Sequence, residues 1–464
     1  MLKIIFLFFM MGGIPVAIAM AGASLVYILG TGNLPPFVVI HRMVGGIDSF
    51  PLLAVPFFIL AGNLMNNAGI TTRIYNFALS LVGWLKGGLG HVNIVGSVVF
   101  AGMSGTAIAD AAGLGTIEIK AMKEHGYSPE FAVGVTAASA TLGPIIPPSL
   151  PFVIYGMMAN VSIGALFLAG LIPGVLLAVL MMLTVAYYAH KNNWGADFKF
   201  SSARLVKALT ELALVIAWPL LLWLAVDKVG LPAQPTVIVG LVLLFVLDKI
   251  FRFEALLPIM TPVLLIGGMT TGLFTPTEGA IAACVWAMVL GFAWYGTLSW
   301  KRFVKVCLET IETTATVLFI VAAASIFGWM LTATGVTTSI AAWVLGFTKD
   351  AWVFLLLANL LMLFVGCFLE PTAAITILVP ILLPIATQLG VDPVHFGLVM
   401  VLNLMIGLLH PPMGLVLFVL ARVANLSFER TTMAILPWLV PLLGSLVVIT
   451  YWPALVLWLP KQFF

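Results

Sequence analysis

Charged residues are scarce in this chain. Asp, Glu, Lys and Arg together make up 8% of its 464 residues, whereas hydrophobic residues make up 62%, and the mean hydropathy is +1.19. Soluble globular domains carry about 25% charged residues, so this composition excludes a soluble domain and indicates an integral membrane protein. Because a helix needs about 20 residues to cross the hydrocarbon core, we expect about a dozen spans and several shorter apolar segments. Clear apolar runs cover residues 4–29, 165–189, 212–226, 256–269, 279–294 and 436–459.

Cysteine and histidine are scarce as well. The three cysteines, Cys284, Cys307 and Cys367, lie far apart in apolar stretches and are odd in number, so they suggest neither a disulfide framework nor a zinc site. The six histidines show no metal-ligand spacing such as HExxH, which argues against a metal enzyme. The net charge of +3 comes mostly from connecting loops and does not suggest nucleic-acid binding.

The chain does contain an internal repeat. A Gly-Pro-Pro break inside a long apolar stretch, residues 143–148, returns at residues 407–412 with three of six positions identical. The match extends to both sides at a constant offset of 264 positions, for example from Gly126 to Gly390. Two broken helices in two homologous halves are predicted. In a membrane protein, this pattern is typical of a transporter whose sites lie near the bilayer midplane.

The positive charges predict the topology. Lys and Arg gather in the connecting segments 190–207, 248–253 and 298–306, and such loops stay in the cytoplasm. This assignment places the turn at residues 275–277 outside and the amino terminus inside. Lys3 and the apolar run after it also resemble a secretory signal, but the rest of the chain favours a retained first span.

A second repeated segment gives the halves opposite orientations. Residues 62–72 resemble residues 328–338 at an offset of 266. The first copy ends inside, beside Arg73, and the second ends outside, where charge is lacking. An inverted repeat lets one polypeptide build two near-equivalent conformations around a fixed site. The alternative is a duplication kept for packing alone, and the duplication of the breaks themselves favours the functional interpretation.

Each half also carries a small-residue cluster upstream of its break, at residues 102–110 and 366–372. The first cluster, with Ser104 and Thr106, lies between apolar arms of about ten residues, which are too short to span a bilayer. Such arms predict a re-entrant hairpin with its tip inside the membrane. The second cluster, with Glu370, predicts an equivalent hairpin.

These breaks suit ions and carboxylates. Unwound helices expose carbonyl oxygens and the hairpin tips add hydroxyl groups, which together are ligands for a small hard cation such as sodium. Helix amino termini beyond the breaks present N–H groups and a positive dipole end to a carboxylate. Because the elements come in pairs, we expect two cation sites related by pseudosymmetry. The alternative is that Gly and Pro serve helix packing only.

Isolated charges in apolar surroundings are further candidates, because a buried ion is expensive unless it is used or paired. Asp110 follows the first tip closely, and Glu370 at the second tip is the stronger functional candidate. Arg422 either meets an anionic substrate or extends to an interface. We expect Glu118 to face water or to pair locally, and Glu278 to cap a helix.

These motifs together resemble a known family. The Ser104-Gly105-Thr106 tip with Ala109-Asp110, the run 143–156, the Gly-Leu-Phe-Thr-Pro-Thr-Glu segment 272–278 and the Asp-Pro-Val-His-Phe-Gly segment 392–397 closely resemble the large membrane subunit of TRAP transporters, the tripartite ATP-independent periplasmic family. The resemblance covers nearly the whole chain.

The resemblance implies an all-α polytopic protein similar to the ion transporter superfamily, with inverted repeats, two re-entrant hairpins and two broken helices, working by an elevator mechanism. It implies sodium-driven import of an organic acid, such as a dicarboxylate, a sialic acid or a sugar acid, across the bacterial inner membrane. The implied partners are a small four-helix membrane subunit on a separate chain and a periplasmic substrate-binding protein.

Matching positions imply two sodium sites, bound mainly through carbonyl groups, with the substrate between the two tips. The first sodium site would use Ser104, Thr106, Gly143, Ile146 and Pro148, and the second Gly366, Glu370, Gly407, His410 and Pro412. For His410 we expect the carbonyl rather than the ring to contribute. The candidate substrate contacts are Ser104, Gly105, Asp110 and Arg422.

The predicted organisation has three parts. Residues 1–189 form the first repeat, with its hairpin near 92–122 and its broken helix near 130–158. Residues 255–464 form the second repeat, with its hairpin near 352–387, its broken helix near 394–425 and a C-terminal span. Residues 190–254 hold a cytoplasmic loop and a two-helix insertion, near 208–252, that departs from the family pattern. We expect the insertion to join the scaffold or the small-subunit interface.

Three other interpretations stay open. A related carrier that works alone, such as a sodium/dicarboxylate symporter, would take up substrate without a binding protein. A channel would need a continuous polar pore lining, which this apolar sequence does not suggest. A membrane enzyme is disfavoured because no paired acidic motif, HExxH or GxSxG nucleophile elbow occurs, so we expect no enzymatic activity.

Overall fold

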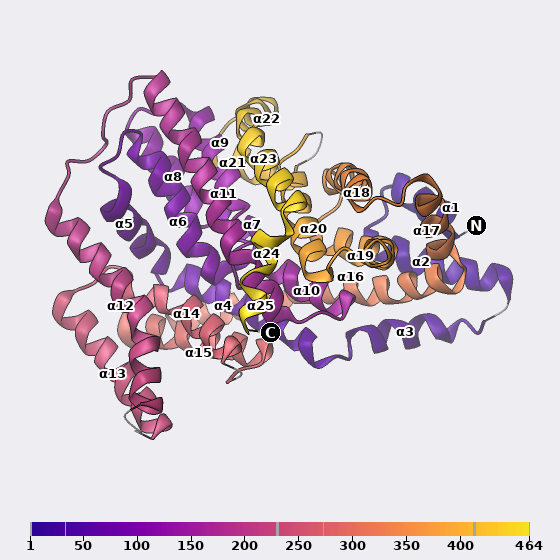
Figure 1. Ribbon diagram of the computed structural model, residues 1–464, viewed down its shortest axis with the longest axis horizontal. Helices are drawn as coiled ribbons and strands as arrows, with labels where there is room; N and C mark the ends of the chain where they lie inside the picture. Colours follow the sequence, from indigo (N-terminus) through magenta and orange to yellow (C-terminus); the bar gives the residue numbers. More distant parts are fainter. Residues whose placement is uncertain (1, 33, 229–231, 272, 412–413, 464) are drawn as a thin grey trace.

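The computed structural model describes residues 2–32, 34–228, 232–271, 273–411 and 414–463 (Figure 1). Within these ranges the chain is almost entirely helical, and the one β feature is an isolated bridge between Lys86 and Ala196. Seven helical stretches in the described part are long and apolar enough to cross a membrane: Phe50–Asn67, Ile163–Lys191, Ser202–Leu222, Pro276–Trp294, Trp300–Ala333, Pro371–Gln388 and Phe428–Tyr451. The prediction of an all-helical, multi-pass membrane protein is confirmed.

The helices of the first half precede the inserted pair. They are α1 (Leu2–Met11), α2 (Val16–Thr31), α3 (Phe37–Ile47), η1 (Phe50–Leu53), α4 (Ala54–Asn67), α5 (Ile70–Val82), α6 (Gly88–Ser104), α7 (Ala107–Ala112), α8 (Leu114–Glu124), α9 (Pro129–Ala140), α10 (Leu150–Ala159) and α11 (Ile163–Lys191). The inserted pair is α12 (Ser202–Asp227) and α13 (Ala233–Phe251).

The second half follows the insertion. Its helices are α14 (Leu256–Thr270), α15 (Pro276–Met288), η2 (Val289–Trp294), α16 (Trp300–Ala333), α17 (Val336–Phe347), α18 (Ala351–Gly366), α19 (Pro371–Gln388), α20 (Pro393–Gly407), α21 (Leu415–Ala424), α22 (Phe428–Ile435), η3 (Leu436–Trp438), α23 (Leu439–Tyr451), α24 (Pro453–Leu457) and α25 (Pro460–Phe463).

Two apolar runs that the sequence presents as continuous are interrupted. In the run 4–29, α1 ends at Met11 and α2 begins after Pro15, because Gly13 adopts the left-handed conformation with φ of 75°. In the run 436–459, α23 ends before Pro453, which has no backbone N–H to continue the helix. Neither run is therefore one straight helix, and fewer helices reach full spanning length than the dozen or so expected from hydropathy.

The two halves interlock through their long helices. In the first half, α2 packs against α16 of the second half, and α15 of the second half packs in turn against α4 of the first. The 34-residue α16 also lies along α3 and α4, and α3 runs beside it across the lower part of Figure 1. Neither half therefore forms a separate body.

The inserted helices α12 and α13 lie at one edge of the molecule, at the lower left of Figure 1. They pack against each other, and α12 also packs against α5 and α14. Glu211 of α12 accepts hydrogen bonds from the backbone N–H groups of Glu254 and Ala255, both at 2.9 Å, which ties α12 to the start of α14. A role in a scaffold or subunit interface stays a prediction.

Two connections between helices are joined to each other near the base of the first hairpin. Lys86 in the α5–α6 connection pairs with Ala196 in the α11–α12 connection through the isolated bridge. The rings of Trp84 and Phe200 make an edge contact with centroids 5.2 Å apart. The two connections are thus held side by side although they are more than 100 residues apart in the sequence.

Asp197 strengthens this junction. Its Oδ2 accepts a hydrogen bond from the backbone N–H of Leu89 at 2.9 Å, in the first turn of α6, and another from the Tyr127 hydroxyl at 2.6 Å. A carboxylate at a helix amino terminus satisfies free N–H groups and complements the dipole. Burial and the neighbouring Asp197 carboxylate raise the pKa of Tyr127.

Candidate functional site

The first hairpin turns between the end of one helix and the start of another. Helix α6 ends at Ser104, Gly105 adopts a left-handed conformation with φ of 64°, and Thr106 caps α7 by accepting a hydrogen bond from the N–H of Ala109 at 3.3 Å. Ser104 is buried, and its hydroxyl oxygen has no hydrogen-bond partner among the described residues. A buried hydroxyl without a partner is costly, so this oxygen is available to a ligand.

The first broken helix is unwound between α9 and α10, over residues 141–149. Ser149 holds the unwound segment by donating from its hydroxyl to the carbonyl of Pro144 at 2.5 Å, and it also caps α10. The Ile146 side chain packs against Gly174 of α11: a Cβ added to Gly174 would lie 2.5 Å from the Ile146 side chain. The segment is therefore fixed at both its middle and its end.

The first tip and the unwound segment meet backbone to backbone. The N–H of Leu150 lies 3.4 Å from the carbonyl of Gly105. An added Cβ on Gly105 would lie 2.8 Å from the Pro148 oxygen, and one on Gly143 would lie 3.0 Å from the Thr106 oxygen. Only residues without a side chain allow this approach. The structure thus brings Thr106, Gly143 and Pro148 of the first predicted set together beside Ser104, whereas the Ile146 side chain packs against α11.

The second tip is organised by Glu370, which caps α19. Its carboxylate accepts hydrogen bonds from the N–H groups of Thr372 at 3.0 Å and Ala373 at 3.3 Å, and from the Thr372 hydroxyl at 2.8 Å. The side chain is therefore occupied in shaping the tip. Each carboxylate oxygen still has acceptor capacity for a further ligand.

The second hairpin and the second broken helix cross at two glycines. An added Cβ on Gly407 would lie 2.6 Å from the Cα of Gly366, so the ends of α18 and α20 are in backbone contact. The His410 ring lies toward the hairpin, with its Nδ1 3.4 Å from the Cys367 sulfur. Pro412, the last predicted residue of the second set, lies outside the described residues.

The two charged candidates for substrate contact occupy different environments. Asp110 on α7 is buried, and its Oδ2 has no hydrogen-bond partner in the described part of the chain. Arg422 is exposed in the last turn of α21, where a cation complements the negative end of the helix dipole. Asp110 lies one helical turn beyond Thr106, whereas Arg422 is about two turns beyond the start of α21.

Sequence reasoning missed a buried polar network in the first hairpin. Glu118 is 2% exposed, so the expectation that it faces water or pairs locally is wrong. Asn93 of α6 donates to Oε2 of Glu118 at 2.5 Å and to the hydroxyl of Thr136 at 2.8 Å, and accepts from Ser139 at 2.7 Å. The signal was present as isolated polar residues within apolar helices, with Thr136 and Ser139 at helical spacing.

The second half contains a comparable but uncharged link. Asn403 of α20 donates to the side-chain oxygen of Asn359 of α18 at 2.7 Å, and Asn359 donates to Thr450 of α23 at 3.1 Å. In both halves a polar contact therefore joins the first arm of the hairpin to the first segment of the broken helix.

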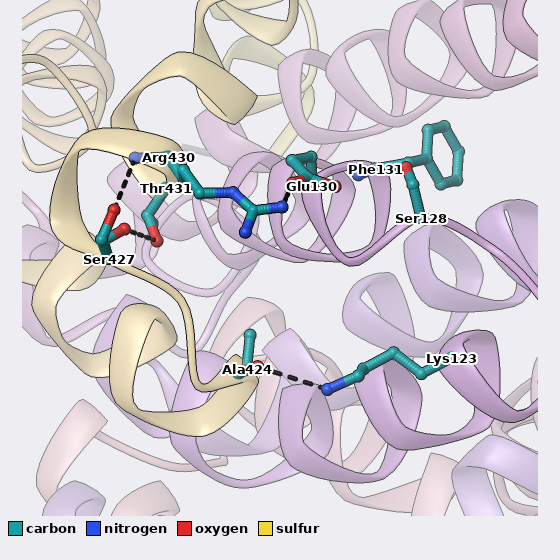
Figure 2. A network of polar contacts seen from close by, with 8 residues as sticks. All are labelled: Lys123, Ser128, Glu130, Phe131, Ala424, Ser427, Arg430 and Thr431. Carbon is teal, nitrogen blue, oxygen red and sulfur yellow. Dashed lines mark hydrogen bonds and ion pairs between the residues drawn. The ribbon is translucent and has the colours of Figure 1, made fainter.

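Two further contacts cross between the halves, as Figure 2 shows. Lys123 at the end of α8 donates to the carbonyl of Ala424 at the end of α21, at 3.3 Å. Glu130 in the first turn of α9 pairs with Arg430 in the first turn of α22. The first hairpin is thus tied to the end of the second broken helix, and the first broken helix is tied to α22, which follows it.

The hairpins differ in exposure. Along α7 and α8, exposed side chains recur at intervals of four or eight residues, at Ile108, Thr116 and Lys120, so they lie on one face. Residues 371–379 of α19 are by contrast all buried. A groove of about 550 Å³ lies between α8 and α21, lined by Thr116, Ile119, Lys120, Lys123, Glu124 and Val423. The second arm of the first hairpin is therefore open along one side, whereas the first half of α19 is enclosed, mainly by α10, α16 and α20. The other arm of the second hairpin, α18, is exposed on one side, for example at Leu360 and Phe364.

The family model described as "Tripartite ATP-independent periplasmic transporter, DctM component" matches residues 3–455. The chain belongs to this family. The predicted identification as the large membrane subunit of a TRAP transporter is confirmed, and the hairpins and broken helices described above are those of a TRAP large permease.

Two relatives show how far the similarity extends. The chain is 42% identical to the sialic acid TRAP transporter large permease protein SiaM of Vibrio cholerae, over 97% of this chain and 96% of that protein. It is 32% identical to the C4-dicarboxylate TRAP transporter large permease protein DctM of Rhodobacter capsulatus, over 97% of this chain and 96% of that protein. The similarity in both cases includes both halves.

A solved structure shares the fold. The crystal structure of the YdaH transporter of Alcanivorax borkumensis superposes with a TM-score of 0.60, covering 90% of this TRAP permease and 87% of that chain. The two sequences are 16% identical, so the likeness concerns the fold alone.

Proposed function

We propose that this chain is the membrane-spanning carrier of a sodium-coupled importer of an organic acid in the bacterial inner membrane. Its amino terminus faces the cytoplasm. It works with a small four-helix membrane subunit and a periplasmic binding protein that delivers the substrate. Family membership and relatives named for sialic acid and C4-dicarboxylate transport support the substrate class.

The observation that carries the sodium part is the backbone contact between each hairpin and its broken helix. At the first tip, the Thr106 carbonyl lies beside the unwound segment. The Ser104 hydroxyl, which has no partner among the described residues, is a second oxygen atom of this tip. Oxygen ligands in an irregular backbone segment suit sodium. At the second tip, the support is the Glu370 carboxylate, four residues beyond Gly366, whose backbone contacts that of Gly407.

We further propose an elevator cycle in which both hairpins and both broken helices move as one body against the remaining helices. The polar contacts within each half and the contacts in Figure 2 support a single moving unit. If the ends of α8 and α21 face the cytoplasm, as the positive charges predict, the open groove beside the first hairpin faces inward in this conformation.

Uptake into proteoliposomes that contain this chain and its small subunit tests the proposal. We expect sialic acid or a C4-dicarboxylate to accumulate only with both an inward sodium gradient and the binding protein. Uptake without the binding protein would support a stand-alone symporter, and flux insensitive to the gradient would contradict sodium coupling.

Substitutions at the tips make this test specific. S104A and E370A are expected to raise the sodium concentration needed for half-maximal uptake. Because E370A also removes the cap of α19, thermal unfolding of each variant is measured alongside uptake. Ser299→Ala, at an exposed helix cap far from both tips in the sequence, is the control and should leave the sodium dependence as it is. A sodium dependence unchanged in both tip variants would contradict the assigned ligands.

A further inference from the structure

Glu118 is a buried acid that the proposed sodium sites do not use. It lies on α8 between α6 and α9, with 2% of its surface exposed. Its Oε2 accepts the 2.5 Å hydrogen bond from Asn93, whereas its Oε1 has no hydrogen-bond partner among the described residues. Oε1 instead lies beside Gly96: a Cβ added to Gly96 would be 2.9 Å from Oε1 and 3.2 Å from the Leu114 side chain.

No positive charge compensates this acid in the part of the chain that the structure describes. The titratable groups near it are Asp110 of α7, which is also buried and has one oxygen without a partner among the described residues, and Tyr75 of α5, which is uncharged when protonated. On the side of α9, Asn93 links Glu118 to two hydroxyl groups: Asn93 donates to Thr136 and accepts from Ser139. Lys120 lies two residues further along α8, about half a turn round the helix, where it is exposed and pairs with Glu124.

Other cations on this helix and its neighbours have partners elsewhere: Arg73 of α5 lies over an aromatic ring, and Lys123 of α8 donates to a backbone carbonyl at the end of α21. His91 of α6 is buried near the start of that helix, and Arg422 of α21 is exposed. An ionised Glu118 would therefore be a buried carboxylate beside another acid without a counter-charge. Such an arrangement is strongly unfavourable, and the acid binds a cation or a proton instead.

The surrounding groups distinguish a proton from a metal ion. Sodium needs several oxygen ligands around it. Asn93 presents its amide nitrogen to Glu118, because its oxygen accepts from Ser139, whereas Oε1 lies beside Gly96, at a place that the apolar Leu114 side chain also approaches. A donor on one side and apolar atoms on the other suit a neutral carboxylic acid, with Oε2 as the acceptor and Oε1 carrying the proton.

We propose that Glu118 is a proton-binding site of the first hairpin, separate from the sodium sites, and that its protonated form is the form competent for transport. Ionisation would place a charge between α6, α8 and α9 and loosen the contact that joins the hairpin to the broken helix. The second half has the uncharged Asn359–Asn403 contact in the comparable place, so this proton dependence belongs to the first hairpin alone.

Infrared spectroscopy of the intact protein in lipid tests proton binding directly and without a transport assay. The wild type is expected to show the C=O stretch of a protonated carboxylic acid at neutral pH, which converts to carboxylate bands as the pH rises. This component should be missing in E118Q and present in E124Q, a control for an exposed acid on the same helix. The proposal is overturned if the difference between the wild-type and E118Q spectra shows only carboxylate bands at every pH measured.

Uptake measured against pH at a constant sodium gradient tests the link to transport, and this part rests on the proposed function. Wild-type and E124Q uptake are expected to fall roughly tenfold per pH unit above the titration of a single group. E118Q, a neutral isostere, should keep neutral-pH activity and lose this decline. A folded but inactive E118Q, or one that declines like the wild type, would contradict the transport role, whereas the infrared result stands independently of the substrate.

Discussion

Asn403 donates a hydrogen bond from its side-chain nitrogen to the side-chain oxygen of Asn359 at 2.7 Å. This contact joins the second broken helix to the first arm of the second hairpin, and Ser139 makes a contact of the same length with Asn93 in the first half. Hydrogen bonds between buried groups are stronger in surroundings of low dielectric constant, and leaving such a group unpaired is costly. Each hairpin is therefore fixed to its broken helix by polar contacts as well as by apolar packing.

Removal of the second link should destabilise the protein. N403A leaves the buried side-chain oxygen of Asn359 without its donor, so we expect the free energy of unfolding to fall by about 1–3 kcal/mol. Thermal unfolding in detergent measures this loss. N192A, at an exposed position, is the control. Equal unfolding temperatures for the two variants would show that the contact contributes nothing to stability.

The crossing of Gly366 and Gly407 predicts intolerance of side chains. G407A would place a methyl group 2.6 Å from the Cα of Gly366, where backbone must shift. We expect a destabilisation of about 1–3 kcal/mol from overpacking and a loss of sodium-dependent uptake. G444A, where an added Cβ meets no atom within 4 Å, is the matched control. Wild-type uptake by G407A would contradict the close crossing.

Asp197 is expected to stabilise the junction at the base of the first hairpin through two partners. D197A removes the acceptor of the Leu89 N–H and of the Tyr127 hydroxyl, and loss of a helix cap costs about 0.5–2 kcal/mol. Unfolding of D197A, Y127F and the double variant forms a double-mutant cycle. Additive losses in that cycle would show that Asp197 and Tyr127 are not coupled.

The Glu130–Arg430 pair predicts a weak dependence of stability on acid pH. A hydrogen bond from its own backbone N–H, together with Arg430, lowers the pKa of Glu130. Because the pKa is lowered in the folded state, the stabilisation is present above the usual carboxyl pKa and is lost as the pH falls through the folded-state pKa. Both side chains are partly exposed, so solvent screening limits the effect to under about 1 kcal/mol.

Thermal unfolding of E130Q and the wild type between about pH 3 and pH 7 checks this sign. The two proteins should differ most at neutral pH and converge in acid. E124Q serves as the control for an exposed acid nearby. A difference that grows on acidification would contradict the assignment.

The amino-acid sequence by itself determined the class of protein, its duplication and its family. These follow from local properties: hydropathy marks a membrane protein, while Gly and Pro at repeated positions mark where helices must break, because their backbone preferences act within a few residues. The tips at Ser104 and Glu370 are therefore visible as breaks in the sequence.

Tertiary structure alone decided which breaks meet and which polar residues are buried together. From its local sequence Glu118 is expected to face water or to pair locally, but it is buried against Asn93, which is 25 positions away. The contact of Gly366 with Gly407 spans more than 40 residues. Likewise, nothing local to the run 4–29 shows how α2 comes to pack on α16 of the other half. Hydropathy records a residue's own preference for water, whereas burial and pairing depend on which distant helix covers it, and packing of the whole chain sets that arrangement.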